Sequence, residues 1–426
     1  MSNLRPLAEC ADFLSGGTPS KAEPRYWTGS IPWASAKDMK RLHLEDTEDH
    51  VSEEGVAAGS RLVPAGTTLV LARGMTLLHD VPISIAKRPM AFNQDVKGLL
   101  ARPGVDPRFL AYALVARRDE LLSFVELAGH GTGRLPTDRL KQLPLWMPPV
   151  AEQLAIAAVL GALDDKIDLN RRTNQTLDEL AQALFRSWFV DFDPVRAKAE
   201  GQQPEGMDAE MAMLFPSRFI EAPHGELPAG WTWLPLDRVA HFLNGLALQK
   251  YPPVDSESLP VIKIAQLRRG SADDADQASA GIPPEYVVQD GDILFSWSGS
   301  LLVSMWAGGR GALNQHLFKV TSAAYPKWFY LLWCKKHLPE FQRIAQAKAT
   351  TMGHIQRHHL TQALVAVPSP ELIEAANQFF EPLLARWLAN ALECQTLLAL
   401  RDTLLPKLLS GEIRVGEAED QVAASA

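Results

Sequence analysis

A chain of 426 residues that is 46% hydrophobic and 22% charged, with a net charge of −8, has the composition of a folded protein and excludes a wholly disordered one. Its length supplies material for roughly two to four domains. No apolar run approaches the roughly 18 residues that a membrane span needs, so we expect a cytoplasmic protein with no membrane partner. The three cysteines match no zinc or redox spacing, which agrees with a reducing compartment.

The net charge is distributed unevenly along the chain. Residues 1–150 hold 18 Lys and Arg against 17 Asp and Glu, and residues 231–370 hold 13 against 10. Residues 151–230 hold 7 against 14, and residues 371–426 hold 4 against 9. The two near-neutral segments can still bind a phosphate backbone through basic patches, because the local field matters more than the total charge.

The sequence contains an internal repeat that begins near its first residues. PLAECADFLSGGTPSK at residues 6–21 returns as PLDRVAHFLNGLALQK at residues 235–250, with seven identical positions. The repeat continues as FNQDV at residues 92–96 and LNQHL at residues 313–317. This self-similarity predicts two copies of one folding unit, each made of a domain of about 140 residues followed by a long helix.

Each repeated domain mixes strand and helix patterns. Short β-type runs, such as TTLVLA at residues 67–72 and LPVIKIAQL at residues 259–267, are separated by turn sequences. A helical stretch then begins at Pro107 in the first copy and at Tyr325 in the second. We therefore expect an α+β fold with two similar α/β domains, whose polar loops are suited to carry binding contacts.

A heptad pattern follows each domain. Apolar residues recur in alternating steps of four and three, and this average of about 3.5 residues is typical of helices that wrap around one another. The first seam comprises Ile156, Leu160, Leu163, Ile167, Asn170, Asn174, Leu177, Ala181, Leu184 and Trp188, and the second comprises Ala376, Phe380, Leu383, Trp387, Asn390, Cys394, Leu397, Arg401, Leu404 and Leu408. We expect two long helices that form an antiparallel coiled coil and relate the two domains by an approximate twofold axis.

An asparagine occupies the same layer of both seams, Asn170 in the first and Asn390 in the second. A polar seam residue disfavours shifted registers, because a shift leaves its amide unpaired. If the helices are antiparallel, a pair between Asn170 and Asn390 also places Leu163 opposite Leu397. The alternative is that one or both asparagines face solvent at the edge of the seam.

These patterns divide the chain into six parts. The segment between the two copies is rich in Pro, Gly and acidic residues, which indicates a long connection. The expected parts are a first domain at residues 1–147, a central helix at 148–192, a linker at 193–230, a second domain at 231–367, a distal helix at 368–412 and a tail at 413–426.

Several stretches resemble the specificity subunit of type I restriction-modification systems, in order and over nearly the whole chain. Residues 148–195, which begin PPVAEQLAIAAVLGALDDKIDLN, resemble the central conserved helix of that family, and LRDTLLPKLLSGEI at residues 400–413 resembles the end of its distal helix. GGTPSKAEPRYWTGSIPWASAKDM at residues 16–39 and ALNQHLFKV at residues 312–320 look like elements of its target recognition domains. GGTPS in the first copy is GLALQ in the second, so the two domains need not read DNA through the same loop residues.

The resemblance implies a subunit that selects a DNA sequence and performs no chemistry itself. Two target recognition domains at opposite ends of the helical spacer would each read half of a split site in double-stranded DNA. Two such domains can face half-sites about one helical turn apart, roughly 34 to 36 Å. Two methyltransferase subunits, which bind S-adenosylmethionine and methylate adenine, would dock on the helices, and restriction subunits would join them. The chain itself would bind no cofactor.

Catalytic motifs are missing from the sequence. There is no GxxxxGK[ST] loop, no GxGxxG after a strand and no HExxH. His354 and His358 could share a helix face as metal ligands, but no carboxylate or cysteine nearby completes a site, so a basic loop or helix start that meets phosphates is favoured. Two other functions stay open: a coiled-coil scaffold that joins two protein-binding domains without DNA contact, and an enzyme with an unrecognised site. The salt dependence of binding to random and site-containing duplexes separates a scaffold from a DNA reader.

Base reading requires long or amide-bearing side chains that reach the major groove. The candidates in the first domain are Lys37, Arg73, His130, Thr132 and Arg134, and those in the second are Lys250, Arg268, Arg269, Arg310, His354 and Arg357. Most of those that touch DNA are expected to contact phosphates, because backbone contacts outnumber base contacts.

Two further features are interpreted as structural. Asn93-Gln94 and Asn314-Gln315 occur in both domains, whereas residues that discriminate two different half-sites should differ, so a shared hydrogen bond is favoured over base reading. Five tryptophans are interpreted as core or seam aromatics, namely Trp33, Trp188, Trp231, Trp297 and Trp387.

Overall fold

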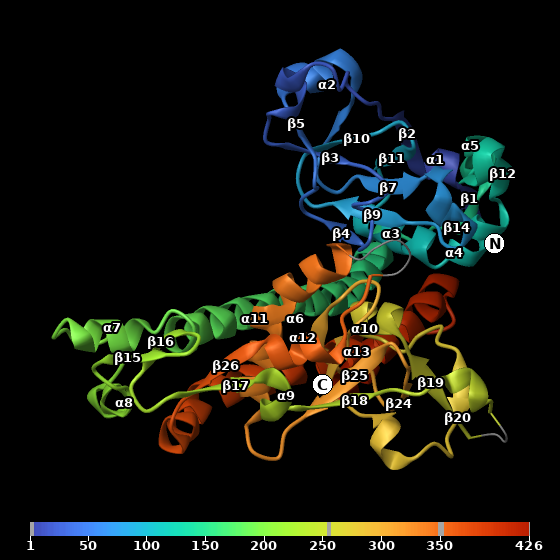
Figure 1. Cartoon of the computed structure of the whole chain (residues 1–426). Coiled ribbons are helices and arrows are strands. Elements are labelled where there is room, and N and C mark those ends of the chain that lie inside the picture. The colour runs from blue at the N-terminus through green and yellow to red at the C-terminus, as the bar shows by residue number, and fades with distance from the viewer. Residues whose placement is uncertain (1–3, 254–256, 348–352, 426) are drawn as a thin grey trace. The chain divides into compact units, whose positions relative to one another are not determined.

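The computed structural model describes residues 4–253, 257–347 and 353–425 (Figure 1). The chain divides into two compact units: unit 1 consists of Met1–Lys166 with Leu397–Ala426, and unit 2 consists of Ile167–Thr396. Both units combine helices with β-sheets, as an α+β fold requires. Across the described ranges, no helix is both long enough and apolar enough to cross a bilayer.

Unit 1 is built on two main sheets. The larger has the strand order β2 (Ala11–Ser15), β11 (Val96–Ala101), β7 (Thr68–Leu71), β9 (Ile83–Ala86) and β4 (His43–Leu44), and the smaller has the order β5 (His50–Val51), β3 (Ile31–Ala34), β10 (Met90–Phe92) and β6 (Leu62–Val63). Helix α3 (Pro107–Val115) packs against β7, β9 and β11. It begins where Pro107 presets a helical φ and the Asp106 carboxylate accepts a hydrogen bond from the Phe109 N–H at 2.8 Å. The domain also contains β1 (Leu4–Pro6) paired with β14 (Pro144–Trp146), and helices α1 (Leu7–Cys10), α2 (Glu53–Gly59), α4 (Arg118–Ser123) and α5 (Thr137–Gln142).

Unit 2 repeats this plan. One sheet has the order β18 (His241–Asn244), β25 (Leu317–Thr321), β22 (Ile293–Ser296) and β23 (Val303–Met305), and another has the order β20 (Gln277–Ser279), β19 (Ser258–Ile262), β24 (Gly311–Leu313) and β21 (Val287–Val288). The β1–β14 pair of unit 1 corresponds to β17 (Thr232–Pro235) paired with β26 (Leu364–Val367). Helices α9 (Leu236–Val239), α10 (Ile264–Arg269), α11 (Lys327–Ala347) and α12 (Arg357–Gln362) complete the domain. The repeated sequence therefore folds into two sheets with the same order of shared strands in each unit, while β4 of unit 1 has no counterpart among the described strands of unit 2.

The repeated polar residues occupy equivalent positions in the two units. In each unit the asparagine side-chain oxygen accepts a hydrogen bond from the N–H two residues further on, at 3.1 Å for Asn93 and 3.3 Å for Asn314. The repeated glycines pass close to this loop, because a Cβ on Gly16 or Gly245 would lie 2.2 Å from a carbonyl oxygen of the loop. The shared structural hydrogen bond predicted for the asparagines is confirmed.

The helices α6 (Val150–Phe189) and α13 (Pro370–Ser410) each extend across the division between the units. In unit 2 the Ile167 carbonyl oxygen lies 3.7 Å from the Cys394 Sγ, and the Asn174 amide donates to the Trp387 carbonyl oxygen at 2.9 Å. Higher residue numbers on α6 thus meet lower numbers on α13. The two helices therefore run antiparallel within unit 2.

The asparagine layer in unit 2 is paired differently from the expectation. The Asn390 amide donates to Asn174 Oδ1 at 2.9 Å, and the Asn170 amide donates to Glu393 Oε2 at 2.7 Å. Asn390 thus meets Asn174, about one helical turn beyond Asn170. All three asparagines are buried, which excludes a position at the solvent edge. Asn170 and Asn174 are consecutive seam positions, so periodicity alone could not decide which of them meets Asn390.

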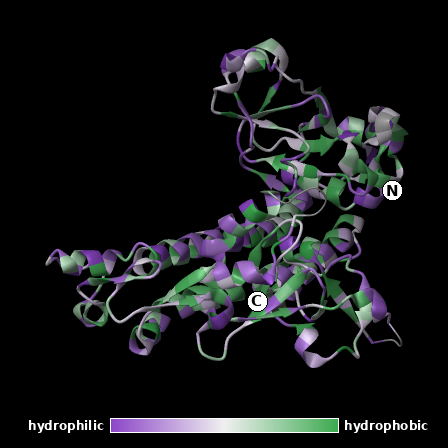
Figure 2. Ribbon diagram, viewed as in Figure 1, coloured by the Kyte–Doolittle hydropathy of each residue, from purple (hydrophilic) through white to green (hydrophobic). Residues whose placement is uncertain are grey.

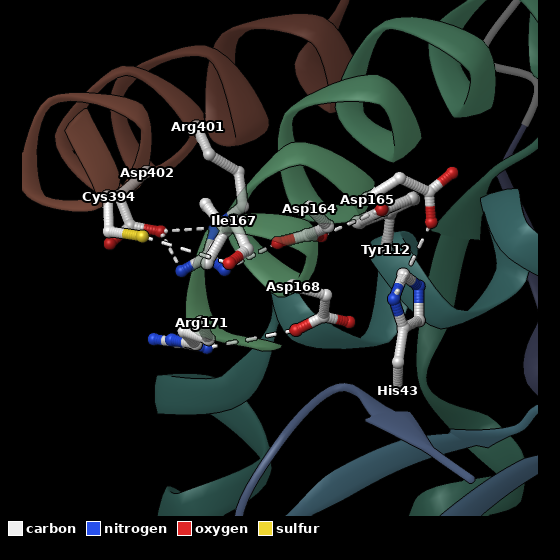
Figure 3. Close-up of polar contacts among 10 residues, drawn as sticks. All are labelled: His43, Tyr112, Asp164, Asp165, Ile167, Asp168, Arg171, Cys394, Arg401 and Asp402. Carbon is white, nitrogen blue, oxygen red and sulfur yellow. Dashed lines mark hydrogen bonds and ion pairs between the residues drawn. The ribbon is translucent and has the colours of Figure 1, made fainter. Parts of the chain in front are cut away.

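In unit 1 a buried carboxylate joins the same two helices to the domain. Asp164 of α6 is 5% exposed and accepts hydrogen bonds from the Tyr112 hydroxyl and the Arg401 guanidinium, both at 2.8 Å (Figure 3). Burial and the neighbouring Asp164 raise the pKa of the Tyr112 phenol, so the hydroxyl stays protonated and can donate. Because Tyr112 lies on α3 and Arg401 on α13, this one carboxylate fastens three helices together.

The core of unit 2 is rich in aromatic side chains. The rings of Trp328 and Phe380 stack with centroids 4.3 Å apart, and Phe185 meets Trp333 edge to face at 5.2 Å. Such pairs contribute beyond the apolar area that they bury. Figure 2 shows hydrophobic residues concentrated on the strands, while the long helices alternate between hydrophilic and hydrophobic residues along their length. Of the five predicted structural tryptophans, Trp33, Trp188 and Trp231 are buried, while Trp297 and Trp387 are half-buried.

Two segments outside the repeats are also folded. Residues 193–230, expected as a plain connection, contain α7 (Asp193–Ala199), α8 (Ala209–Leu214) and a hairpin of β15 (Phe219–Ala222) and β16 (Gly225–Pro228). Val195, Met211 and Phe215 are buried in the core of unit 2, which makes the segment an integral part of that unit. In the tail, α14 (Val415–Ser425) buries Ala418 in the core of unit 1.

Candidate nucleic-acid interface

A three-stranded sheet of unit 1 brings two arginines face to face. Its order is β12 (Glu126–Ala128), β13 (Thr132–Arg134) and β8 (Arg73–Gly74). The register places Arg134 directly opposite Arg73 and, on its other side, opposite Glu126. Both arginines are exposed, and neither forms an ion pair or side-chain hydrogen bond with a described residue.

The arginine pair is suited to an anionic partner. Like charges directly opposite each other in a strand pair are unfavourable, and Glu126 is the one carboxylate beside them in this sheet. A phosphate would offset this repulsion, and a guanine edge would accept two hydrogen bonds from either guanidinium. Arg73 and Arg134 are 61 positions apart, so the fold and not the local sequence brings them together.

The other candidates of the first domain lie in two places. Thr132 begins β13 and donates a hydrogen bond to the Gly129 carbonyl oxygen at 3.3 Å, so it is close to the arginine pair. His130 lies in the turn before β13, and its side chain is outside the described part. Lys37 forms ion pairs with Glu48 at 3.1 Å and Asp49 at 3.0 Å. The hydrogen bonds with Asp49 and Glu48 raise the pKa of the Lys37 amine, and its charge is already paired.

Unit 2 brings the equivalent two segments together with different side chains. Ser298 follows β22 and His354 precedes α12, and the two residues form an isolated antiparallel bridge. The Ser298 hydroxyl lies 2.9 Å from His316 Nδ1, which anchors this bridge to the loop after β24. One structural position therefore holds Arg73 and Arg134 in unit 1 and Ser298 and His354 in unit 2.

Two candidates of the second domain lie around a common aromatic pair. The Trp297 ring is 6.4 Å from the His354 ring and 5.9 Å from the Phe318 ring. The Arg357 guanidinium lies 5.9 Å from the Phe318 centroid and donates to the Phe242 carbonyl oxygen at 3.5 Å. The fold thus gathers His354 and Arg357 into one patch.

A cleft of about 730 Å³ in unit 2 adjoins the Ser298–His354 bridge. Its lining includes Arg268 and the residues next to the bridge, Gly299 and Gly353. Arg268 is exposed and forms no ion pair with a described residue. Arg269 differs, because it donates to the Asp273 carbonyl oxygen at 3.0 Å and pairs with Asp274 at 3.4 Å. Of these two neighbouring arginines, Arg268 lines the cleft and Arg269 does not.

A second cleft of unit 2, about 670 Å³, is lined by apolar residues together with four amide-bearing ones. The lining includes Gln249, Gln277, Asn314, Gln315 and His316. Sequence reasoning did not single out Gln249 or His316, and it interpreted Gln315 as structural. The change from GGTPS to GLALQ between the two copies could have indicated Gln249, but it gives no signal for Gln315 or His316.

The last two candidates of the second domain are exposed. Lys250 follows directly after Gln249 in the chain but is not among the residues that line the second cleft. Arg310 is exposed just before β24 and lines neither of these two clefts.

The histidine cluster does not have the helical geometry that a metal site would need. Helix α12 begins at Arg357, so His354 lies outside it and does not share a helix face with His358. His359 is buried, and its Nδ1 accepts a hydrogen bond from the Gln356 N–H at 2.9 Å, which caps α12. Among the described residues, no group of three or more His, Cys, Asp or Glu side chains could hold a metal ion.

Comparison with known proteins gives consistent matches. Residues 2–179 match the family described as the type I restriction modification DNA specificity domain. The type I restriction enzyme MjaIX specificity subunit of Methanocaldococcus jannaschii is 25% identical over 430 residues, which cover 97% of this chain and 94% of that protein. The HindI specificity subunit of Haemophilus influenzae is 26% identical over 357 residues, which cover 72% of this chain and 77% of that protein.

A solved structure shares the fold. The type I restriction-modification S subunit from M. genitalium superimposes with a TM-score of 0.53 at 15% identity, and the match covers 95% of both chains. At that level of identity the likeness concerns the fold.

Proposed function

Because this chain belongs to the family of type I restriction-modification specificity subunits, we propose that it reads the DNA target of such a complex and is not itself a catalyst. Each repeated domain reads one half of a bipartite site in double-stranded DNA. The helices α6 and α13 act as an antiparallel coiled-coil spacer that sets the distance between the half-sites.

The observation that carries this proposal is the single structural position that holds different polar residues in the two units. Arg73 and Arg134 in unit 1 are replaced by Ser298 and His354 in unit 2. Conserving the backbone while changing the side chains is what a protein needs in order to read two different half-sites with one fold. Arginine pairs favourably with guanine and phosphate, whereas serine and histidine have other hydrogen-bonding preferences.

The chemistry of the complex belongs to partner subunits in this proposal. Two methyltransferase subunits bind S-adenosylmethionine and methylate adenine, and restriction subunits join the same assembly. Residues 151–230 and 371–426, which include both long helices, carry an excess of seven and five acidic residues respectively. Such acidic surfaces repel a phosphate backbone, which favours protein partners there.

The direct test is to map methylated adenines in host DNA with the gene present and with it deleted. We expect a set of sites with two fixed half-sequences and a constant gap, which disappears on deletion. In vitro, the complex with its methyltransferase subunits should bind that duplex at least 1000-fold more tightly than random duplex, and binding should weaken steeply with salt. A protein-binding scaffold would show neither the specificity ratio nor the salt slope.

The arginine pair provides a residue-level test of the same proposal. Arg134→Ala should weaken binding of the complex to its target duplex and should lower the slope of log K against log salt by about one unit if the contact is to a phosphate. The control is Lys37→Ala, because Lys37 is already paired with two carboxylates. Unchanged affinity and salt slope for Arg134→Ala would remove this residue from the interface.

A further inference from the structure

The side chain of one repeated glutamine has different hydrogen-bond partners in the two units. In unit 1 the Thr18 hydroxyl donates a hydrogen bond to Gln94 Oε1 at 2.6 Å, which holds the amide against its own domain. In unit 2 the equivalent glutamine is Gln315, and the position of Thr18 is occupied by Ala247. Alanine has no hydroxyl, so it cannot provide this hydrogen bond. The backbone of the loop is nevertheless held firmly, because the Gln315 N–H donates to the Leu246 carbonyl oxygen at 2.8 Å.

Gln315 lines the 670 Å³ cleft. Its described side-chain contact is a long one, 3.4 Å from Nε2 to His316 Nε2. Gln249, on the same cleft, is exposed and has no hydrogen-bond partner among the described residues. Gln277 differs, because its Oε1 accepts from Ser258 at 2.9 Å and its Nε2 donates to the Ala275 carbonyl oxygen at 3.2 Å. The Gln249 amide and the Gln315 Oε1 therefore have no hydrogen-bond partner among the described residues.

The chemistry of the cleft favours a neutral base edge over a phosphate. A carboxamide offers one acceptor and two donors, and this pattern matches the N7 acceptor and N6 donor of adenine in the major groove. The one lysine of the lining, Lys263, does not convert the cleft into an anion site, because it is paired with Asp276. His316 links the cleft to the Ser298–His354 bridge through its 2.9 Å contact with Ser298. The cleft thus adjoins the position at which the two units already differ.

We propose that Gln249 and Gln315 form a specificity-determining site of unit 2, which recognises adenine of an A·T base pair in one half of the DNA target. This inference rests on the proposed function and deepens it. The loss of one hydroxyl between the copies, from Thr18 to Ala247, releases the glutamine that unit 1 uses structurally.

The test uses the complex with its methyltransferase subunits and a duplex library that varies every base of both half-sites. Gln315→Met keeps the length of the side chain and removes its hydrogen bonds, so the preference for A·T over G·C should fall roughly 10-fold or more at one position of one half-site. Ala247→Thr should have the same effect with Gln315 still in place, because the new hydroxyl can hold the amide as Thr18 holds Gln94. The preferences at the other half-site should not change in either variant.

Gln94→Met is the matched control in unit 1, and it should leave the base preferences of both half-sites intact. Equal melting temperatures of the variants and the wild type establish that folding is preserved. If the wild-type complex is sequence-specific but Gln315→Met and Ala247→Thr leave every base preference unchanged, the inference is overturned and the proposed function stands. If the wild-type complex selects no sequence, the proposed function fails and this inference fails with it.

Discussion

Asp164 and Asp165 are neighbours on α6, but they lie in opposite environments of unit 1. Asp164 is buried and accepts hydrogen bonds from a tyrosine and an arginine. The Asp165 side chain is 49% exposed and has two cationic groups at longer range, Arg108 at 3.5 Å and Lys87 at 3.7 Å, with the His43 ring nitrogen at 3.8 Å. Water screens the contacts of Asp165 but not those of the buried Asp164. Only Asp164 should therefore contribute strongly to the free energy of unfolding.

This contrast predicts the effect of removing each carboxylate. Asp164→Ala should lower the free energy of unfolding by about 2 to 4 kcal/mol. The substitution leaves the buried Tyr112 hydroxyl without its acceptor and leaves Arg401 with Asp402 as its remaining partner. Asp165→Ala, the matched control, should lower it by less than about 1 kcal/mol. Chemical denaturation of both full-length variants measures the two losses. Equal losses would show that burial does not distinguish these two carboxylates.

His337 makes the stability of unit 2 sensitive to pH. Its side chain is buried, and Nε2–H donates to the Leu364 carbonyl oxygen at 2.9 Å. Burial lowers the pKa of the imidazole to about 4. In the unfolded chain the pKa returns to about 6.5. Below that pH the imidazole binds a proton in the unfolded state but not in the folded state. The free energy of unfolding therefore falls as the pH drops from about 6.5 towards 4.

We therefore expect His337 to account for a loss of about 2 kcal/mol in the free energy of unfolding between pH 7 and pH 5. His337→Gln keeps an amide donor for the Leu364 carbonyl and does not titrate, so its stability should fall less over the same range. Chemical denaturation of both proteins at the two pH values gives the difference. An identical pH dependence would mean that His337 is not held neutral in the folded protein.

At the scale of elements, α6 and α13 are joined in unit 2 by aromatic packing and by a polar layer. Trp188 and Phe189 of α6 contact Phe380 of α13 with ring centroids about 6 Å apart. The polar layer contains the hydrogen bond between Asn174 and Asn390. Aromatic packing supplies much of the binding energy between helices, whereas a buried polar pair mainly selects one register.

A double-mutant cycle measures this polar layer. Asn174→Leu or Asn390→Leu alone should lower the free energy of unfolding by about 1 to 3 kcal/mol, because each leaves the buried side chain of the other asparagine without this hydrogen bond. The double variant should lose clearly less than the sum of the two single losses, because no amide is then left unpaired. Denaturation of the four proteins gives the coupling energy. A coupling energy near zero would contradict a direct contact between the two asparagines.

At the scale of the whole molecule, the proposed spacer role of α6 and α13 predicts that longer helices widen the gap between the two half-sites. Inserting seven residues after Ile167 in α6 and seven after Cys394 in α13 preserves the heptad phase of both seams, since these residues are in contact. Each insertion adds about 10 Å of helix, which corresponds to about three base pairs. Methylation mapping should show a wider gap between half-sites whose own sequences are unchanged. An unaltered gap would contradict the spacer role.

Local periodicity and internal repetition predict one part of the fold directly. The match between residues 6–21 and 235–250 predicted two copies of one domain, and the two main sheets of units 1 and 2 have the same order of shared strands. The heptad steps predicted two long helices, which are found at Val150–Phe189 and Pro370–Ser410. Both features depend on continuous stretches of sequence, in which helical periodicity or the identity of a repeat is directly visible.

Contacts between side chains that are distant in the chain could not be predicted in this way. Two consecutive seam asparagines fitted the heptad equally well, and cross-helix packing selected Asn174 as the partner of Asn390. The opposition of Arg73 and Arg134 depends on the pairing of β8 with β13, and strand pairing across long separations leaves no local signature. Gln94 and Gln315 look alike in sequence, yet one is bonded to Thr18 and the other lines a cleft. The state of a side chain depends on what the fold places beside it, and that neighbour is usually remote in the chain.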